Sequence, residues 1–160
     1  MSTKLQITVS QDDQTVTSLM TGPMDAHADY SVIPVVGVRQ LNLDFSGITL
    51  IDSVGIQNWL KFATSIPAAV AVEFHKCPVR VISQLNLFQG FSGNRPVKIR
   101  SFFAPYYCDG CDESRDYILE TEASGLSAAN LRAPAKDCAT CHAAMEFDGI
   151  EKKYFQFLTY

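Results

Sequence analysis

Four of the five cysteines form two Cys-x-x-Cys pairs, and no other feature limits the possible folds of this chain as strongly. The pairs are Cys108/Cys111 and Cys138/Cys141, and 26 residues (112–137) separate them. Thiolates are soft ligands, and Zn²⁺ binds four of them in a tetrahedron. The separation is somewhat longer than usual for such pairs, which leaves room for an elaborated hairpin. The pattern therefore predicts a zinc ribbon with four cysteine ligands.

Other uses of these cysteines remain open. Residues 138–142 read Cys-Ala-Thr-Cys-His, the attachment pattern of c-type haem, but haem attachment needs export and leaves the first pair unexplained. A dithiol redox pair normally lies at a strand–helix junction of an α/β unit, and both pairs lie outside the predicted α/β segment. His142 adjoins Cys141 and is an alternative ligand. We expect the four thiolates to close the shell, which makes the zinc structural, since a catalytic zinc keeps one position open.

The net charge of −4 is concentrated in the C-terminal part of the chain. Residues 1–100 hold eight Lys/Arg and seven Asp/Glu, whereas residues 101–160 hold five and ten. Nucleic-acid binding needs a basic surface, so DNA and RNA are not expected partners. No apolar run approaches the ~20 residues that span a bilayer, and the N-terminus lacks the apolar stretch of a signal peptide. We therefore expect a cytoplasmic protein without a membrane partner, and in that compartment structural disulfides are uncommon.

Residues 1–103 have the pattern of an α/β domain, followed by a small cysteine-bearing domain at 104–160. Apolar alternation predicts hairpin strands at 5–9 and 15–20, and a short helix is expected near Asp25. The rest of the pattern predicts strands at 41–51, 69–74 and 97–103 and helices at 53–66 and 78–88. A hairpin followed by β-α-β-α-β predicts a mixed β-sheet packed with helices. In the second domain, apolar alternation after Cys141 predicts a returning strand.

Helix 53–66 begins directly after a strand, and this corner contains Asp52, Ser53 and Gly55. The first turn of a helix has backbone N–H groups without intrahelical partners and the positive end of the helix dipole. An Asp or Ser there accepts these hydrogen bonds, which stabilises the helix by ~1 kcal/mol. On the apolar face of the helix, Trp59 is expected in the core. Phe62 lies nearer the opposite face, where it contacts either a neighbouring element or a partner protein.

Three segments resemble the STAS family, the bacterial anti-sigma-factor antagonists and the cytosolic domains of sulfate transporters. They are Gly-Pro-Met-Asp (22–25), Asp-Phe-Ser-Gly (44–47) and Ile-Asp-Ser-Val-Gly (51–55). The family pairs an Asp-x-Ser-Gly strand with an Asp-Ser-(Ser/Thr)-Gly corner, and Val54 stands where the family usually has Ser or Thr. The predicted element order also fits, so the resemblance covers roughly residues 3–103.

The resemblance implies a non-enzymatic signalling module that binds another protein. In antagonist members, a serine kinase that also acts as an anti-sigma factor phosphorylates the serine that matches Ser53. The resemblance implies that Ser53, Asp52, Gly55 and Asp25 together form the corner that binds the partner. A phosphate adds ~1.5 to 2 negative charges, and a helix N-terminus tolerates an anion. The cysteines also leave open a zinc/thiol redox sensor, and the resemblance leaves open a small-ligand-binding STAS domain. No nucleophile–base constellation or phosphate-binding glycine loop indicates an enzyme.

Overall fold

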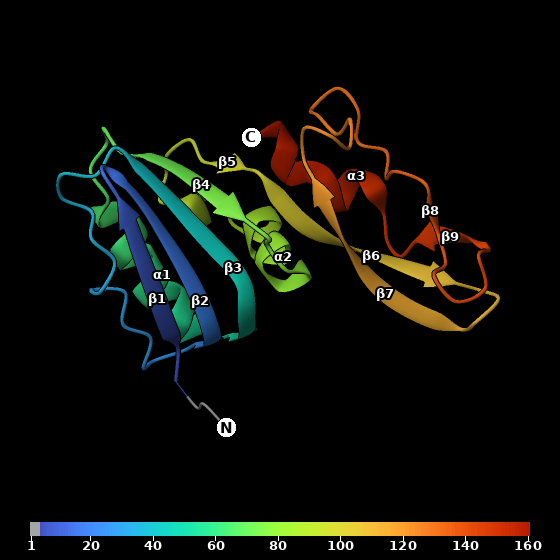
Figure 1. The fold of residues 1–160 in the computed structure, drawn as a ribbon, viewed down its shortest axis with the longest axis horizontal. Helices are drawn as coiled ribbons and strands as arrows, with labels where there is room; N and C mark the ends of the chain where they lie inside the picture. Colours follow the sequence, from blue (N-terminus) through green and yellow to red (C-terminus); the bar gives the residue numbers. More distant parts are fainter. Residues whose placement is uncertain (1–3) are drawn as a thin grey trace.

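A mixed five-stranded sheet forms the first half of the molecule (Figure 1). The computed structural model describes residues 4–160, so residues 1–3 of the predicted first domain lie outside the described part. The order is β1-β2-β3-β4-β5; β1 and β2 are antiparallel, and the later neighbours are parallel. The strands are β1 (Gln6–Asp12), β2 (Thr15–Met24), β3 (Gln40–Ile51), β4 (Ala71–His75) and β5 (Lys98–Ile99). The predicted mixed α/β architecture is confirmed, while its assignment to the STAS family stays a prediction.

Two helices cover one face of this sheet: α1 (Ser53–Ser65) and α2 (Val79–Leu87) (Figure 1). Successive side chains of a strand point to opposite sides, so alternate residues of β2 and β3, such as Met20 and Leu43, are buried beneath the helices. The other face of β2 is largely exposed.

Aromatic side chains fill the space between α1 and the sheet. Trp59 is fully buried as predicted, and its indole nitrogen donates a 2.7 Å hydrogen bond to the carbonyl of Phe91 in the short helix η1 (Gln89–Ser92). Phe62 stacks on buried Tyr30, with ring centroids 5.4 Å apart. Phe62 therefore packs against the loop that follows β2.

Residues 25–39 do not form the short helix expected near Asp25. The carboxylates of Asp25 and Asp29 instead accept hydrogen bonds from the backbone N–H groups of His27 and Ser31, at 2.8 and 2.9 Å. Asp side chains stabilise turns in this way and so compete with helix formation. The expected helix at Asp25 is therefore wrong, and its place is taken by two successive turns.

A four-stranded antiparallel sheet, ordered β7-β6-β9-β8, forms the second half of the molecule. Its strands are β6 (Ser101–Cys108), β7 (Glu113–Glu120), β8 (Lys136–Asp137) and β9 (Ala144–Phe147). The strand predicted after Cys141 is confirmed over β9 alone, because the residues that follow β9 are not part of a strand. The chain then turns into helices α3 (Glu151–Tyr154) and η2 (Phe155–Thr159), whose Phe155 and Phe157 are buried against Phe102 of β6.

Strand β6 belongs to both halves of the molecule. At its start, Phe103 N–H donates to the carbonyl of Cys77, which follows β4, at 2.8 Å. At its end lies Cys108. The expected strand at 97–103 is thus split between β5 and β6, and the predicted domain boundary after residue 103 falls inside β6.

The helical C-terminus also ties the two halves together. Asn86 of α2 donates a 2.7 Å hydrogen bond to the carbonyl of Tyr154, and the Tyr154 hydroxyl donates to the carbonyl of Phe103. Among the described residues, no helix has the length and apolar character needed to cross a membrane.

Candidate metal centre and strand–helix corner

The four paired cysteines meet at the far end of the second sheet. Cys108 ends β6, and Cys138 directly follows β8. Strands β6 and β9 pair at Tyr106↔Phe147 and Tyr107↔Glu146, which brings the two Cys-x-x-Cys turns together. The predicted ligand set is therefore assembled in space as well as in sequence.

The sulfur positions fit a tetrahedral metal ion. Cys108 Sγ lies 3.5 Å from Cys141 Sγ, and Cys138 Sγ lies 3.8 Å from Cys111 Sγ. All four sulfurs lie within 4.8 Å of one another. A tetrahedron with metal–sulfur bonds of about 2.3 Å has sulfurs about 3.8 Å apart. These four cysteines can therefore hold a metal ion with little rearrangement.

The two turns share a backbone design. The residue after the second cysteine of each turn has a left-handed conformation, with φ of 52° at Asp112 and 60° at His142. Asp and His tolerate this region better than most residues. His142 takes this turn position and donates its N–H to the carbonyl of Cys138 at 2.9 Å. His142 is not part of the four-residue cluster.

Crowding of the four thiols favours a cation at their centre. Backbone N–H groups of Cys141 and Thr140 lower the pKa of the Cys138 thiol to about 6. The hydrogen bond between Cys111 and Cys141 raises the pKa of Cys111 to about 12. A divalent ion would offset the charge of several neighbouring thiolates, and metal binding would release their protons. Cys108 and Cys138 are buried and Cys141 is exposed.

Two contacts near the cluster had no signal in the sequence. Arg115 of β7 donates to the hydroxyl of Thr140, inside the second turn, at 3.0 Å. The Tyr107 hydroxyl donates to the Asp112 carboxylate, which steadies the first turn. Arg115 and Tyr107 belong to strands whose alternating pattern is common in any sheet, so the sequence does not single them out. Only the pairing of the strands places them beside the two turns.

The corner residues also come together. Asp52 is the N-cap of α1, and its carboxylate accepts the Gly55 N–H at 2.7 Å. Asp52 N–H donates to the carbonyl of Met24 at the end of β2, and Asn58 of α1 reaches the carbonyl of Asp25. The described part of the chain offers no hydrogen-bond partner to the exposed Ser53 hydroxyl. The helix cap therefore belongs to Asp52 and leaves Ser53 unengaged.

Replacement of Asp52 should weaken the helix more than replacement of Ser53. We expect Asp52→Ala to lower the free energy of unfolding by ~1 kcal/mol, because the Gly55 N–H loses its acceptor. Ser53→Ala removes no hydrogen bond and should cost less than ~0.5 kcal/mol. Urea denaturation followed by Trp59 fluorescence measures both. Equal losses in the two variants would contradict the assignment of the cap.

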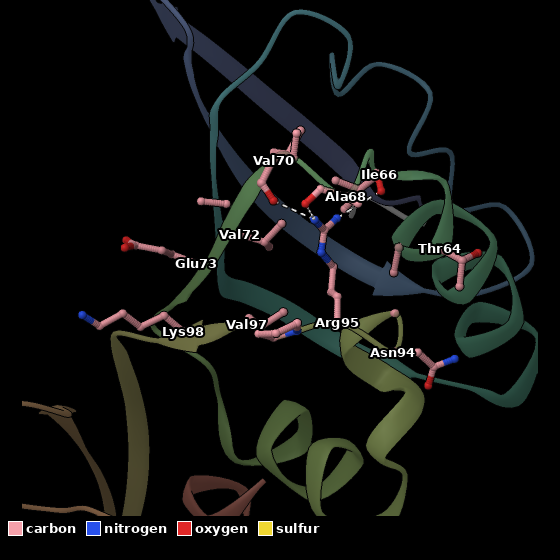
Figure 2. Close-up of a pocket in the computed structure, with 15 residues that line it drawn as sticks. Thr64, Ile66, Ala68, Val70, Val72, Glu73, Asn94, Arg95, Val97 and Lys98 are labelled. Carbon is pink, nitrogen blue, oxygen red and sulfur yellow. Dashed lines mark hydrogen bonds between the residues drawn. The ribbon is translucent and has the colours of Figure 1, made fainter.

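A cleft lies away from the cysteines and from the corner. It has a volume of about 1050 Å³ and lies between the end of α1, the start of β4 and residues 93–98 (Figure 2). Arg95 reaches across it and donates to the carbonyls of Ile66, Pro67 and Val70 at 3.1, 2.9 and 2.7 Å. Since α1 has no basic residue in its last turn, Arg95 supplies the positive charge that the helix C-terminus favours. The cleft is therefore bridged by a structural arginine.

This bridge can be tested by removing only its donors. Arg95→Met keeps most of the side-chain volume, and we expect it to lower the free energy of unfolding by about 1 to 3 kcal/mol. Lys61→Met is the matched control, because Lys61 is an exposed cation on the same α1. Urea denaturation of both variants gives the comparison. Equal effects would mean that the carbonyl contacts of Arg95 add nothing to stability.

Comparisons of the chain with protein-family models and with curated proteins find no match.

Proposed function

We propose that this protein is a non-enzymatic regulatory module, resembling an anti-sigma-factor antagonist, that binds a protein partner at the corner around Ser53. The observation that supports it is the exposed Ser53 hydroxyl at the start of a 13-residue helix whose cap is made by its neighbour Asp52. A kinase can reach this hydroxyl without breaking a structural hydrogen bond. We expect a phosphate there to leave the fold intact, because a helix N-terminus favours an anion.

The surroundings of Ser53 suit a contact surface. Leu50 and Val54 flank it and are 53% and 44% exposed. Apolar side chains at the centre of an interface contribute most of its binding energy, and a new phosphate beside them would disfavour docking by adding charge that must be desolvated. Phosphorylation of Ser53 would in this way release a partner such as an anti-sigma or serine-kinase-like protein.

The test compares partner capture by the full chain and its variants. Wild type, Ser53→Ala, Ser53→Asp and Ser65→Asp are used as bait in extracts of the organism that encodes the protein. Ser65 lies exposed at the other end of α1, so Ser65→Asp places the same charge on the same helix far from the corner. We expect Ser53→Asp alone to lose partners that the other baits retain. If all four baits recover the same proteins equally, Ser53 does not regulate binding.

The metal in the cysteine cluster is proposed to be zinc with a structural role, in a protein that we place in the cytoplasm. Zinc accepts four thiolates in a closed tetrahedral shell, which leaves no position for substrate or water. Structural disulfides are uncommon in that compartment, which would leave the four cysteines available as thiolate ligands. Elemental analysis of the purified protein should give one zinc per chain. Iron or no metal at all would contradict the proposal.

A zinc/thiol redox sensor is the second candidate, and the exposure of Cys141 favours it. Hydrogen peroxide would oxidise the Cys141 thiolate to sulfenic acid with loss of hydroxide. Attack by a second cluster thiolate would form a disulfide, expel the sulfenic oxygen as water after protonation, and release the metal. Zinc release measured against peroxide concentration tests this. Four inert thiolates under conditions that oxidise a free cysteine would exclude it.

A further inference from the structure

The four cysteines of the candidate metal centre differ in how far solvent reaches them. Cys108 and Cys138, the first cysteines of the two turns, are 0% and 1% exposed. Cys111 is half-buried, and Cys141 is exposed. All four sulfurs lie within 4.8 Å of one another, so a molecule in solution reaches the cluster most directly at Cys141.

Backbone contacts of the sulfurs divide the cysteines in the same way. Thr140 N–H donates to the sulfur of Cys138 at 3.4 Å, and the N–H of Cys111 interacts with the sulfur of Cys108. The hydrogen bonds of the described residues include no backbone donor to the sulfur of Cys111 or Cys141. An N–H donated to a thiolate stabilises it and lowers its nucleophilicity. The second cysteine of each turn is therefore held less firmly than the first.

A difference between the two turns accounts for the exposure of Cys141. A Cβ at Gly110, in the first turn, would lie only 3.3 Å from the Cys141 sulfur. The second turn has Thr140 at the corresponding third position, and Arg115 donates to the Thr140 hydroxyl at 3.0 Å. Because glycine has no side chain, the first turn leaves the Cys141 sulfur uncovered on this side.

We propose that Cys141 is the exchangeable ligand of the metal centre and that a small thiol takes its place on the metal. This inference rests on the proposed zinc site. The sulfur–metal bond of the incoming thiol forms while that of Cys141 breaks, and the proton of the incoming thiol passes to the Cys141 sulfur. The shell is closed before and after the exchange. The remaining ligands come from both turns, so the turns stay joined.

The charge around the cluster favours a thiol that carries no other negative group. Zn²⁺ with four thiolates has a net charge of −2, and thiolate-bound zinc accepts a further sulfur in place of one that leaves. The two turns and the residues beside them add five acidic side chains: Asp109, Asp112, Glu113, Asp137 and Glu146. The nearby cation Arg115 is already paired with Glu113 at 3.0 Å. A carboxylate or phosphate on the incoming molecule would therefore be repelled.

Limited alkylation identifies the ligand that leaves first. The zinc-loaded full chain is treated with less than one equivalent of N-ethylmaleimide, which is uncharged, and peptide mass spectrometry locates the adduct. We expect most of the adduct at Cys141. Gly110→Ala should slow the modification of Cys141 about threefold or more, because the added Cβ covers its sulfur. Asp109→Ala, an exposed position in the same turn, adds no atom there and is the matched control.

Zinc transfer to a chromophoric chelator tests the exchange itself. We expect 2-mercaptoethanol to speed transfer from the wild type in proportion to its concentration. At equal thiolate concentration and low ionic strength, mercaptoacetate should speed it less, because its carboxylate is repelled. Equal acceleration by the two thiols would contradict the preference for an uncharged thiol.

Other outcomes separate this inference from the proposed zinc site. The exchange at Cys141 is wrong if the first adduct lies on another cluster cysteine, if Gly110→Ala and Asp109→Ala slow the reaction equally, or if 2-mercaptoethanol leaves the transfer rate unchanged. In each of these cases zinc is bound and the metal centre stands. A chain without zinc by elemental analysis would instead overturn the metal centre and the exchange with it.

Discussion

Replacing Cys138 by serine is expected to abolish metal binding and to unfold the cysteine end of the second sheet. The two Cys-x-x-Cys turns meet through their four sulfurs and the short pairing of β6, β8 and β9. In small zinc-folded units the metal contributes on the order of 10 kcal/mol to folding. Without it, strands of two and four residues cannot hold the turns together. We expect β8 and β9 to lose their order first.

Hydrogen-exchange mass spectrometry, together with elemental analysis, measures this effect. Protection should disappear in residues 136–147 of Cys138→Ser, and equally in wild type treated with a chelator, while β2 and β3 keep theirs. Cys77→Ala is the matched control, because Cys77 is fully buried and lies outside the cluster. It should keep its metal. Unchanged metal content and unchanged protection in Cys138→Ser would show that the cluster holds no ion.

Adding one methyl group at Gly55 is expected to be the most destabilising conservative change in the first half of the molecule. A Cβ at this position would lie 1.8 Å from the carbonyl oxygen of Met24 and 2.7 Å from the backbone nitrogen of Asp25. Both are backbone atoms in contact with the corner, so α1 would have to move away from β2. We expect Gly55→Ala to lower the free energy of unfolding by about 3 kcal/mol.

The direction in which Gly55→Ala changes the free energy of unfolding tests this prediction. Glycine is a poor helix former, so Gly→Ala inside an unobstructed helix stabilises by up to about 1 kcal/mol. Val54→Ala, in the same turn of α1 but exposed, is the control and should change stability by less than about 1 kcal/mol. Urea denaturation of the two variants decides between the alternatives. A stabilised Gly55→Ala would mean that α1 and β2 do not approach this closely.

The family resemblance implies that Gly55 belongs to a corner that binds a partner. The structure shows that Gly55 also has a packing role. The glycine allows the end of β2 to touch the first turn of α1. This close approach lets the Met24 carbonyl accept the Asp52 N–H at 3.1 Å. Any use of Ser53 as a switch therefore depends on Gly55 for the position of the corner.

Local patterns made the elements of the candidate site predictable from sequence. Each Cys-x-x-Cys spacing predicts a turn that presents two sulfurs to one metal ion. The cysteines concerned are Cys108, Cys111, Cys138 and Cys141. The start of α1 was equally visible, because strand alternation changes to helical spacing at Asp52, a residue with strong capping preference. In both cases the residues that determine the structure are neighbours in the chain.

What depended on tertiary contacts could not be predicted. The sequence predicts a domain boundary after residue 103, yet β6 continues across this point and includes Pro105. The Pro105 carbonyl accepts the Asp148 N–H at 2.9 Å, and in a strand the N–H and C=O of one residue point to the same neighbour. The missing N–H of Pro105 therefore faces away from β7, and the ladder between β6 and β7 stays intact. Only the pairing partners on each side of the strand reveal this.

Because β6 belongs to both halves of this protein, the side-chain alternation along this one strand orients residues in both halves. Side chains alternate along the strand, so deletion of a single residue between Phe103 and Cys108 would turn the cysteine to the opposite side of its sheet. The hydrophobic contacts at the other end of β6 would stay in place. An insertion or deletion in this segment therefore preserves the side-chain orientation only if it changes the length by two residues. A transplant of the cysteine-bearing half onto another protein would have to include β6 together with the segment after β4, whose Cys77 carbonyl accepts the Phe103 N–H.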